Sequence, residues 1–186
     1  MGKLVYGMSV SLDGYVNGPD GTFGWTEPED QLSRFVNEVQ SRVGTYLFGR
    51  RMFETMRVWE DDAALVDLPD YALEYGPIYR AAEKVVFSTA MEDPVLPKTR
   101  VVRRLDPDAV RTLKQSTAAD LEVAGPTLAG DLLRDGLVDE LTLFVVPVVV
   151  GAGTRFLPDQ LSLRLSLVEE RRFASGTVFL RYAIQR

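Results

Sequence analysis

The alternation of strand-like and helix-like segments is the feature that most constrains the fold of this chain. Short apolar or β-branched runs, such as Lys3 to Leu12 and Thr45 to Gly49, precede segments whose apolar residues have helical spacing. The pattern changes near the C-terminus, where the runs Leu163 to Phe173 and Gly176 to Ile184 follow one another across a short turn. This order predicts an α/β three-layer sandwich, in which a central mixed and mostly parallel sheet ends in an antiparallel C-terminal hairpin.

The length and composition fit one domain spanning residues 1–186. With 186 residues, of which 46% are hydrophobic, the chain can bury a core without disulfides or metals. The pattern is poor only between Glu60 and Pro77, where we expect a loop with a helical turn or two. The run from Glu140 to Gly151 predicts one long apolar strand.

Two missing residue types limit the chemistry. The chain has no cysteine and no histidine, which excludes thiol nucleophiles, imidazole bases and the usual zinc sites, so no metal is expected. A net charge of -6 argues against nucleic acid as a partner. No segment approaches the ~18 continuous apolar residues of a membrane span, and the N-terminus lacks a signal-peptide cleavage pattern. We therefore expect a cytoplasmic protein that does not bind membranes.

Two junctions between a strand and a helix could bind phosphate groups. Gly125 and Pro126 stand between the strand-like "LEVA" and a helix, where proline needs no amide partner and the next free amides can face an anion. A similar junction begins at Gly49 and continues with Arg50 and Arg51. If the two strands are neighbours, the junctions could hold the two ends of a dinucleotide. The alternative is that each glycine only turns a corner, as is common in α/β proteins.

Three segments carry a resemblance to a known family. "VAGPTLAGDLLRDGLVDELTLFVVPVVVGAG" strongly resembles the C-terminal reductase domain of the bacterial riboflavin-biosynthesis deaminase-reductase. "MSVSLDGYVNGPDG" is similar to the first strand and active-site loop of that family. "GRRMFETM" resembles a helix start of dihydrofolate reductases. The chain is identified as a member of the dihydrofolate-reductase-like superfamily, in a form without the deaminase half.

The resemblance implies that NADPH is the cofactor and indicates which residues bind it. Those expected on the adenosine side are Gly49, Arg50, Arg51 and Met52, with Ser88 and Thr89 near the 2'-phosphate. Those expected at the pyrophosphate are Gly125, Pro126, Thr127 and Leu128. Dihydrofolate reductases carry a cis peptide bond at the position of Ala124–Gly125, where alanine replaces the first glycine of the family motif.

The resemblance also implies a substrate site near "WTEPED". Asp30 follows Trp25 at the spacing of the pterin-binding acid of bacterial dihydrofolate reductases. In an apolar cleft such a carboxylate would bind a heterocycle and, with its proton affinity raised by burial, would act as the catalytic acid. Trp25 would stack on a ring, and Arg34 is the candidate for binding an acidic tail. The alternative for Asp30 is a helix cap favoured by the helix dipole. Asp13 is interpreted as a turn residue.

One position departs from the riboflavin-pathway pattern. Reductases of that pathway carry a glutamate directly before "AGPTLA", but this chain has Val123 there, and strand alternation would point Glu122 to the opposite face. The main prediction is therefore an NADPH-dependent reductase acting on a small heterocyclic, pterin- or pyrimidine-like acceptor. The alternatives are the riboflavin-pathway 5-amino-6-(5-phosphoribosylamino)uracil reductase itself and a non-catalytic nucleotide-binding protein.

The apolar character of Glu140 to Gly151 and the open edge of the hairpin indicate a homodimer. A monomer whose helices cover both faces of the sheet remains the alternative.

Overall fold

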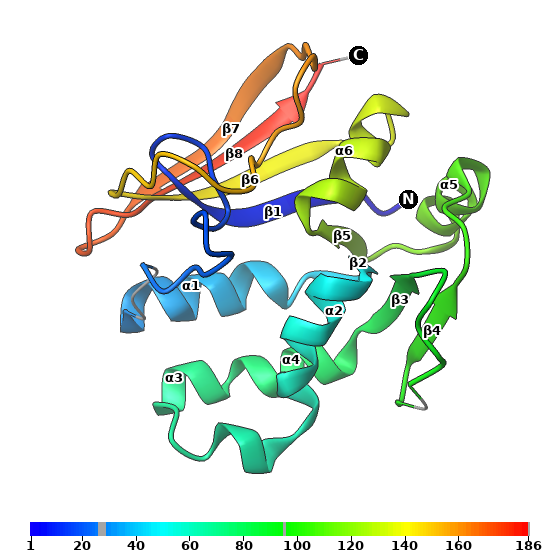
Figure 1. Cartoon of the computed structure of the whole chain (residues 1–186), viewed down its shortest axis with the longest axis horizontal. Helices are drawn as coiled ribbons and strands as arrows, with labels where there is room; N and C mark the ends of the chain where they lie inside the picture. The colour runs from blue at the N-terminus through cyan, green and yellow to red at the C-terminus, as the bar shows by residue number, and fades with distance from the viewer. Residues whose placement is uncertain (26–28, 95, 186) are drawn as a thin grey trace.

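The computed structural model describes residues 1–25, 29–94 and 96–185. Its centre is an eight-stranded sheet with the order β4-β3-β2-β5-β1-β6-β8-β7 (Figure 1). The strands are β1 (Leu4–Ser11), β2 (Val43–Gly49), β3 (Glu83–Phe87), β4 (Thr99–Val102), β5 (Asp120–Ala124), β6 (Glu140–Val146), β7 (Leu165–Arg172) and β8 (Val178–Ile184).

The sheet is mixed in the way that the sequence predicts. Strands β4, β3, β2, β5, β1 and β6 run parallel to one another, whereas β8 is antiparallel to both β6 and β7. Helices connect the parallel strands except β3 and β4, which are joined by residues 88–98, and the β7–β8 hairpin turns at residues 173–177. The expected mostly parallel sheet with an antiparallel end is confirmed.

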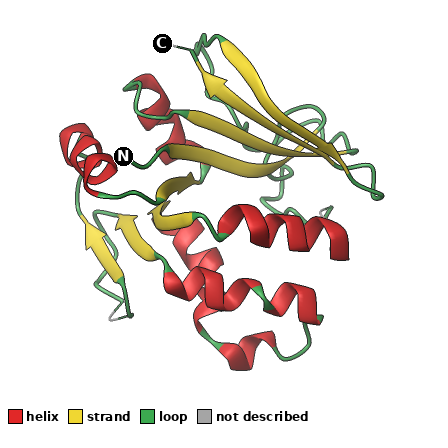
Figure 2. Cartoon of the chain, turned by 180° about the vertical axis from the view of Figure 1, so that it is seen from behind, coloured by secondary structure: helices red, strands yellow, loops and turns green. Residues whose placement is uncertain are grey.

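Helices cover both faces of the sheet (Figures 1 and 2). Helices α1 to α4 lie on one side, and α5 and α6 lie on the other. The helices are α1 (Asp30–Gln40), α2 (Arg50–Met56), α3 (Asp70–Leu73), α4 (Tyr75–Ala81), α5 (Pro107–Ser116) and α6 (Pro126–Arg134), with short 3-10 turns η1 (Arg57–Glu60) and η2 (Asp62–Leu65) after α2.

The core is divided by the sheet. On the α6 side, Tyr6 and Val123 pack with Leu132 in one apolar cluster, because alternate residues of a strand point to opposite faces. On the other side, aromatic rings fill the space: Phe35 of α1 lies 4.8 Å, centroid to centroid, from Phe179 of β8. Apolar side chains thus pack helices against both faces of the sheet, and this packing fixes the positions of the strand ends.

Two elements differ from the sequence-based expectation. Strand β6 ends at Val146 rather than continuing to Gly151, because Pro147 cannot donate a ladder hydrogen bond. Helix α4 runs through Pro77, which lies in its first turn, where a missing N–H costs nothing. Every peptide bond between described residues is trans, including Ala124–Gly125. Within the described ranges, no helix is both long and apolar enough to cross a bilayer.

Candidate functional site

The two glycine junctions lie next to each other at the carboxyl edge of the sheet. Strands β2 and β5 are paired in parallel, with Phe48 opposite Ala124, so Gly49 and Gly125 both come one residue after this pair. A Cβ atom built on Gly125 would lie 3.5 Å from the Cβ atom of Met52 in the first turn of α2. The starts of α2 and α6 therefore come together, as the dinucleotide hypothesis requires.

The backbone at α6 is arranged for close approach. Gly125 has φ of +99°, a conformation that residues with side chains rarely adopt. Pro126 is the first helical residue, so the free amides of this end belong to Thr127 and Leu128. These amides and the positive end of the helix dipole favour an anion. At the other junction, open space surrounds the position that a Cβ on Gly49 would take.

The basic residues of α2 have weak partners. Arg50 donates to Glu54 at 3.4 Å along the helix, and both side chains are about half exposed. Arg51 is exposed, and its carbonyl accepts a hydrogen bond from the Thr55 hydroxyl. An exposed pair such as Arg50–Glu54 contributes little to stability, and no ion pair of Arg51 occurs among the described residues, so both guanidinium groups can bind an external anion at low cost.

Strand β3 brings Ser88 to the same edge, together with an arginine that sequence reasoning missed. Phe87 pairs with Gly49 on one side and with Val102 of β4 on the other, so Arg50, Ser88 and Arg103 follow the ends of three adjacent strands. Arg103 donates to the carbonyl oxygens of Ser88 and Met91, and the Ser88 hydroxyl accepts from the amides of Ala90 and Met91. Arg103 thereby fixes the turn that presents Ser88. Arg103 is identified only by the pairing of β4 with β3, which places it beside Ser88, and the sequence alone does not show this pairing.

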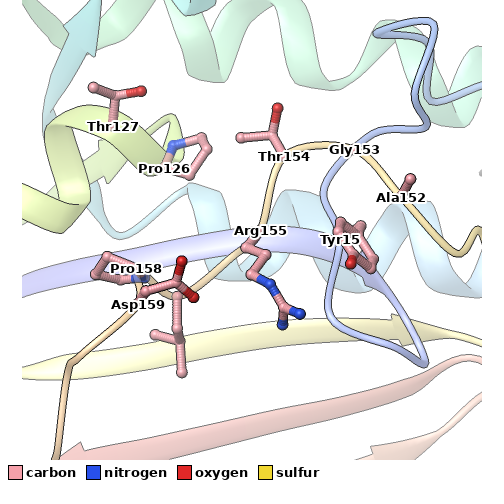
Figure 3. Close-up of a pocket in the computed structure, with 10 residues that line it drawn as sticks. Tyr15, Pro126, Thr127, Ala152, Gly153, Thr154, Arg155, Pro158 and Asp159 are labelled. Carbon is pink, nitrogen blue, oxygen red and sulfur yellow. The ribbon is translucent and has the colours of Figure 1, made fainter.

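A pocket of about 550 Å³ adjoins the start of α6. Its walls come from the start of α6, the loop after β1 and the loop after β6 (Figure 3). The lining residues are Tyr15, Pro126, Thr127, Ala152, Gly153, Thr154, Arg155, Leu157, Pro158 and Asp159. Pro126 and Thr127 were expected at a site, whereas those from Ala152 onward were not.

Hydrogen bonds hold the two loops of this pocket together. The Asp13 carboxylate accepts from the backbone amides of Val150 and Gly151, and the Asn17 side chain accepts from the amide of Thr154. Hydrogen bonding to Ser11, and then to Gly151 and Val150, lowers the pKa of Asp13. Gly153 fits tightly, because a Cβ on it would lie 2.0 Å from the carbonyl oxygen of Asn17. Asp13 thus orders the two loops, but its carboxylate bonds to amides of the loop after β6 rather than to amides of its own turn, which corrects its interpretation as a turn residue.

Asp30 does not lie in the buried cleft that the resemblance implies. Its side chain is 62% exposed, and its carboxylate accepts from Arg34 at 2.6 Å. Arg34 also donates to Glu74 at 2.6 Å, so this arginine is occupied by two carboxylates. The expected apolar surroundings of Asp30 are wrong, because the first turn of α1 faces solvent on this side. The helix-cap alternative also needs correction, since Asp30 is the first helical residue and Glu29 occupies the cap position.

Trp25 precedes the first residue of α1 by five positions and is half-buried. Its Nε1 atom is buried and has no hydrogen-bond partner among the residues that the structure describes. A buried indole N–H normally has a partner, so this donor is suited to a ligand acceptor. The intervening residues 26–28 of the motif lie outside the described residues.

Glu122 and Val123 point to opposite faces, as strand alternation predicts. Val123 is fully buried on the α6 side, whereas both carboxylate oxygens of Glu122 accept from Nε2 of Gln40, at 3.0 and 3.1 Å, under α1. Burial raises the pKa of Glu122 to about 8, partly opposed by the hydrogen bonds from Gln40. Gln40 in turn accepts from the hydroxyl of Tyr46 at 2.8 Å. This network connects α1, β2 and β5 and does not line the pocket beside α6.

The family model of the RibD C-terminal domain matches residues 2–179. The chain therefore belongs to the RibD C-terminal domain family, the reductase-like family that the sequence segments resemble. This membership and the sheet topology confirm the predicted fold class.

Individual relatives agree with this assignment. The protein YyaP of Bacillus subtilis is 27% identical over 184 residues, covering 97% of this chain and 94% of the relative. The riboflavin biosynthesis protein RibD of Escherichia coli is 56% identical over 34 residues, which are 18% of this chain and 9% of that protein. A crystal structure from Shewanella sp. PV-4, named as a candidate riboflavin biosynthesis protein, has a TM-score of 0.76 at 19% identity and covers 99% of both chains.

Proposed function

We propose that this protein is an NADPH-dependent reductase that transfers hydride to a small heterocyclic, pterin- or pyrimidine-like acceptor. The observation that carries the proposal is the juxtaposition of the two glycine junctions, in which Gly125 lies against Met52. Two helix starts at adjacent strand ends present free amides to one region, and a pyrophosphate is the group that such an arrangement suits. Membership of a reductase-domain family agrees with this chemistry.

The charges along the sheet edge support NADPH rather than NADH. Arg50, Arg51, Ser88 and Arg103 lie at the ends of β2, β3 and β4, although the chain as a whole has a net charge of -6. A 2'-phosphate gains charge-assisted hydrogen bonds from guanidinium groups, whereas a ribose hydroxyl gains less. The adenosine end would therefore lie toward β4 and the nicotinamide end toward β1 and β6.

The cofactor would supply the hydride, and the chain would orient the reactants. Pro126, Thr127 and Leu128 would hold the pyrophosphate through the start of α6. Trp25, with its unpartnered Nε1, is suited to bind the acceptor from the α1 side. Asp30 remains the proposed proton donor because of its spacing from Trp25. Its exposure and its ion pair with Arg34 mean that binding of the acceptor would have to exclude water and displace this arginine.

The riboflavin-pathway reductase is the second candidate. The short, strong match to the Escherichia coli protein favours it. Against it stands Val123, which occupies the position of the substrate-binding glutamate with an apolar, fully buried side chain. The acceptor panel below separates the two candidates.

The test is a fluorescence titration with NADPH, followed by NADPH oxidation in the presence of oxidised pterins, pyrimidines and the riboflavin-pathway intermediate. Saturable binding with turnover of a pterin or pyrimidine supports the proposal, and preference for the pathway intermediate supports the second candidate. Binding without turnover across the panel would indicate the non-catalytic alternative.

A further inference from the structure

A row of polar side chains crosses the sheet near its amino edge, on the face that α1 covers. Val5 of β1 pairs with Glu122 of β5 on one side and with Glu140 of β6 on the other. Thr142, two residues after Glu140, pairs with Arg181 of β8. Paired residues of neighbouring strands point to the same face, and Glu122 is bonded to α1, so these side chains all lie on the α1 side.

These side chains surround a small cavity. Its volume is about 20 Å³, and its wall is formed by Val5, Val39, Arg42, Val43, Asp120, Glu122, Glu140, Thr142 and Arg181. A cavity needs about 10 to 15 Å³ and two to four polar partners to hold a water molecule. Gly7 leaves room here, because a Cβ on it would lie 2.4 Å from Oγ1 of Thr142 and 3.3 Å from Oε2 of Glu122. The cavity therefore has the size and the polar wall of a site for one water.

Arg181 brings a donor without an acceptor to this cavity. Its side chain is 16% exposed, and its Nη2 atom lies 3.4 Å from the carboxylate of Glu169. Its Nε atom is buried, and within the described part of the chain nothing accepts a hydrogen bond from it. A buried N–H is costly to leave unpaired, so this group calls for an acceptor inside the cavity.

Glu122 needs an acceptor from the same side. Its carboxyl group is buried, and both oxygens accept from Nε2 of Gln40, at 3.0 and 3.1 Å. Burial raises the pKa of Glu122 to about 8, so the group carries a proton at neutral pH. The amide nitrogen of Gln40 can only donate. The hydroxyl of the protonated Glu122 must therefore find its acceptor elsewhere.

The other titratable groups around Glu122 and the cavity have partners of their own. They are Arg42 after α1, Tyr46 of β2, Tyr75 of α4, Asp120 of β5 and Glu140 of β6. Arg42 pairs with Glu38 at 3.1 Å, and Lys3 pairs with Glu140 at 2.5 Å. The Tyr75 hydroxyl donates to that of Tyr46, which donates to Gln40. Arg42 and Lys3 are thus committed to other carboxylates, whereas Arg181 offers an unused N–H.

We propose that the cavity binds one water molecule, which joins Arg181 to Glu122 and makes this arginine the counter-ion of the acid when its proton leaves. The water accepts from Nε of Arg181 and from the hydroxyl of the protonated Glu122. Its own two hydrogens are donated to Glu140 and Thr142. When Glu122 ionises, the proton passes through the water to solvent, and the water turns to donate to the new carboxylate.

The bound water has a consequence for α1. Because the charge forms beside Arg181 rather than in an apolar interior, Glu122 can release and take up its proton in place. Gln40, the last residue of α1, can then keep its hydrogen bonds to Glu122 in both protonation states. The site lies away from the proposed cofactor, so it does not depend on the proposed function.

The experiment titrates the Glu122 carboxyl group by carbon-detected NMR from about pH 5 to about pH 10, with Glu122→Gln to assign its signal. Arg181→Met removes the charge and the Nε donor, and Arg172→Met is the control, an exposed arginine of β7. Loss of a nearby cation disfavours the carboxylate, so Arg181→Met should raise the titration midpoint of Glu122 by about 0.5 to 1 pH unit. Arg172→Met should leave the midpoint unchanged.

A second measurement uses the wild type alone. We expect a nuclear Overhauser effect between Hε of Arg181 and a water that stays bound far longer than surface water. Absence of such a water would overturn the proposal even if Arg181→Met does not fold. An unchanged midpoint in folded Arg181→Met, or an equal rise in Arg172→Met, would overturn it as well. Neither measurement involves NADPH.

Discussion

A Cβ atom built on Gly125 would lie 3.5 Å from the Cβ atom of Met52, although the two residues are 73 positions apart in the sequence. The parallel pairing of β2 with β5 creates this contact, because both strands end at the same edge. Neither residue has a charged or acid–base side chain. Together they bring two helix starts to one place, and the proposed cofactor site depends on that placement.

Arg50 and Arg51 are predicted to set the preference for NADPH. Replacing both by glutamine should weaken NADPH by about 1.5 to 3 kcal/mol and leave NADH nearly unchanged, since only NADPH carries the 2'-phosphate. Arg134→Gln is the matched control, because Arg134 also forms an intrahelical pair at 3.4 Å, near the other end of α6. Calorimetric titration of both cofactors measures the effect. Equal losses for NADPH and NADH would refute the assignment.

Glu122 is predicted to make stability fall as pH rises. Burial raises its pKa from 4.5 to about 8 in the folded protein, so the folded state holds a proton that the unfolded state has lost between these values. The stabilisation is complete below about pH 4.5, decreases by about 1.4 kcal/mol per unit through the window, and is lost above about pH 8. Glu122→Gln should flatten this slope and stabilise the protein at pH 7.5 by roughly 2 to 4 kcal/mol.

Urea unfolding at several pH values checks this prediction. Glu83→Gln, an exposed acid on β3, removes the same charge and should keep the slope of the wild type. An unchanged slope in Glu122→Gln would show that another group causes it.

Much of the fold follows from local chemistry in the sequence. The α6 junction is predictable because Gly125 and Pro126 carry the backbone preferences that a strand-to-helix corner needs. Helix α4 is not predictable in this way, because a proline such as Pro77 indicates a loop unless it is known to lie in the first turn of a helix. The wall formed by Ala152 to Asp159 depends on contacts with residues 13–17, and no local pattern encodes such contacts.

The candidate site also has parts that the sequence predicts and parts that it does not. Neighbouring positions for Gly49 and Gly125 follow from two strand-end motifs once the strands are paired. The exposure of Asp30 could not be derived from its spacing to Trp25, because spacing does not tell which side of α1 faces the sheet.

Asp30→Asn tests the proposed proton donor. The change keeps the shape and hydrogen-bonding capacity of the side chain but removes the transferable proton. Turnover of an acceptor that the wild type reduces should therefore fall ~10²- to 10⁴-fold, while the affinity for NADPH stays the same. The control is Asp108→Asn, an acid in the first turn of α5 that also pairs with an arginine of its own helix. Steady-state kinetics across pH measures both. Full activity of Asp30→Asn would move the proton source to water or another acid.

The homodimer is proposed from the exposed face of the hairpin. Leu167 and Val168 of β7 are 51% and 54% exposed, and β7 is the edge strand of the sheet. Unpaired edges with apolar side chains favour association with a second copy. Leu167→Lys together with Val168→Glu should shift a dimer toward monomer in sedimentation at micromolar concentration. Only the 20.8 kDa species in wild type would contradict the proposal.

The most direct test of the central claim is NADPH titration of wild type, Gly125→Val and Gly136→Val. Gly125 and Gly136 both have positive φ, +99° and +64°, so both variants carry backbone strain, but Gly136 lies beyond the other end of α6. We predict saturable binding to wild type and to Gly136→Val, and at least about 100-fold weaker binding to Gly125→Val, because its side chain stands where the pyrophosphate approaches. Circular dichroism establishes that each variant is folded, and Gly125→Ala offers a smaller change. Unchanged affinity in a folded Gly125→Val protein, or no saturable binding to wild type, would contradict the account.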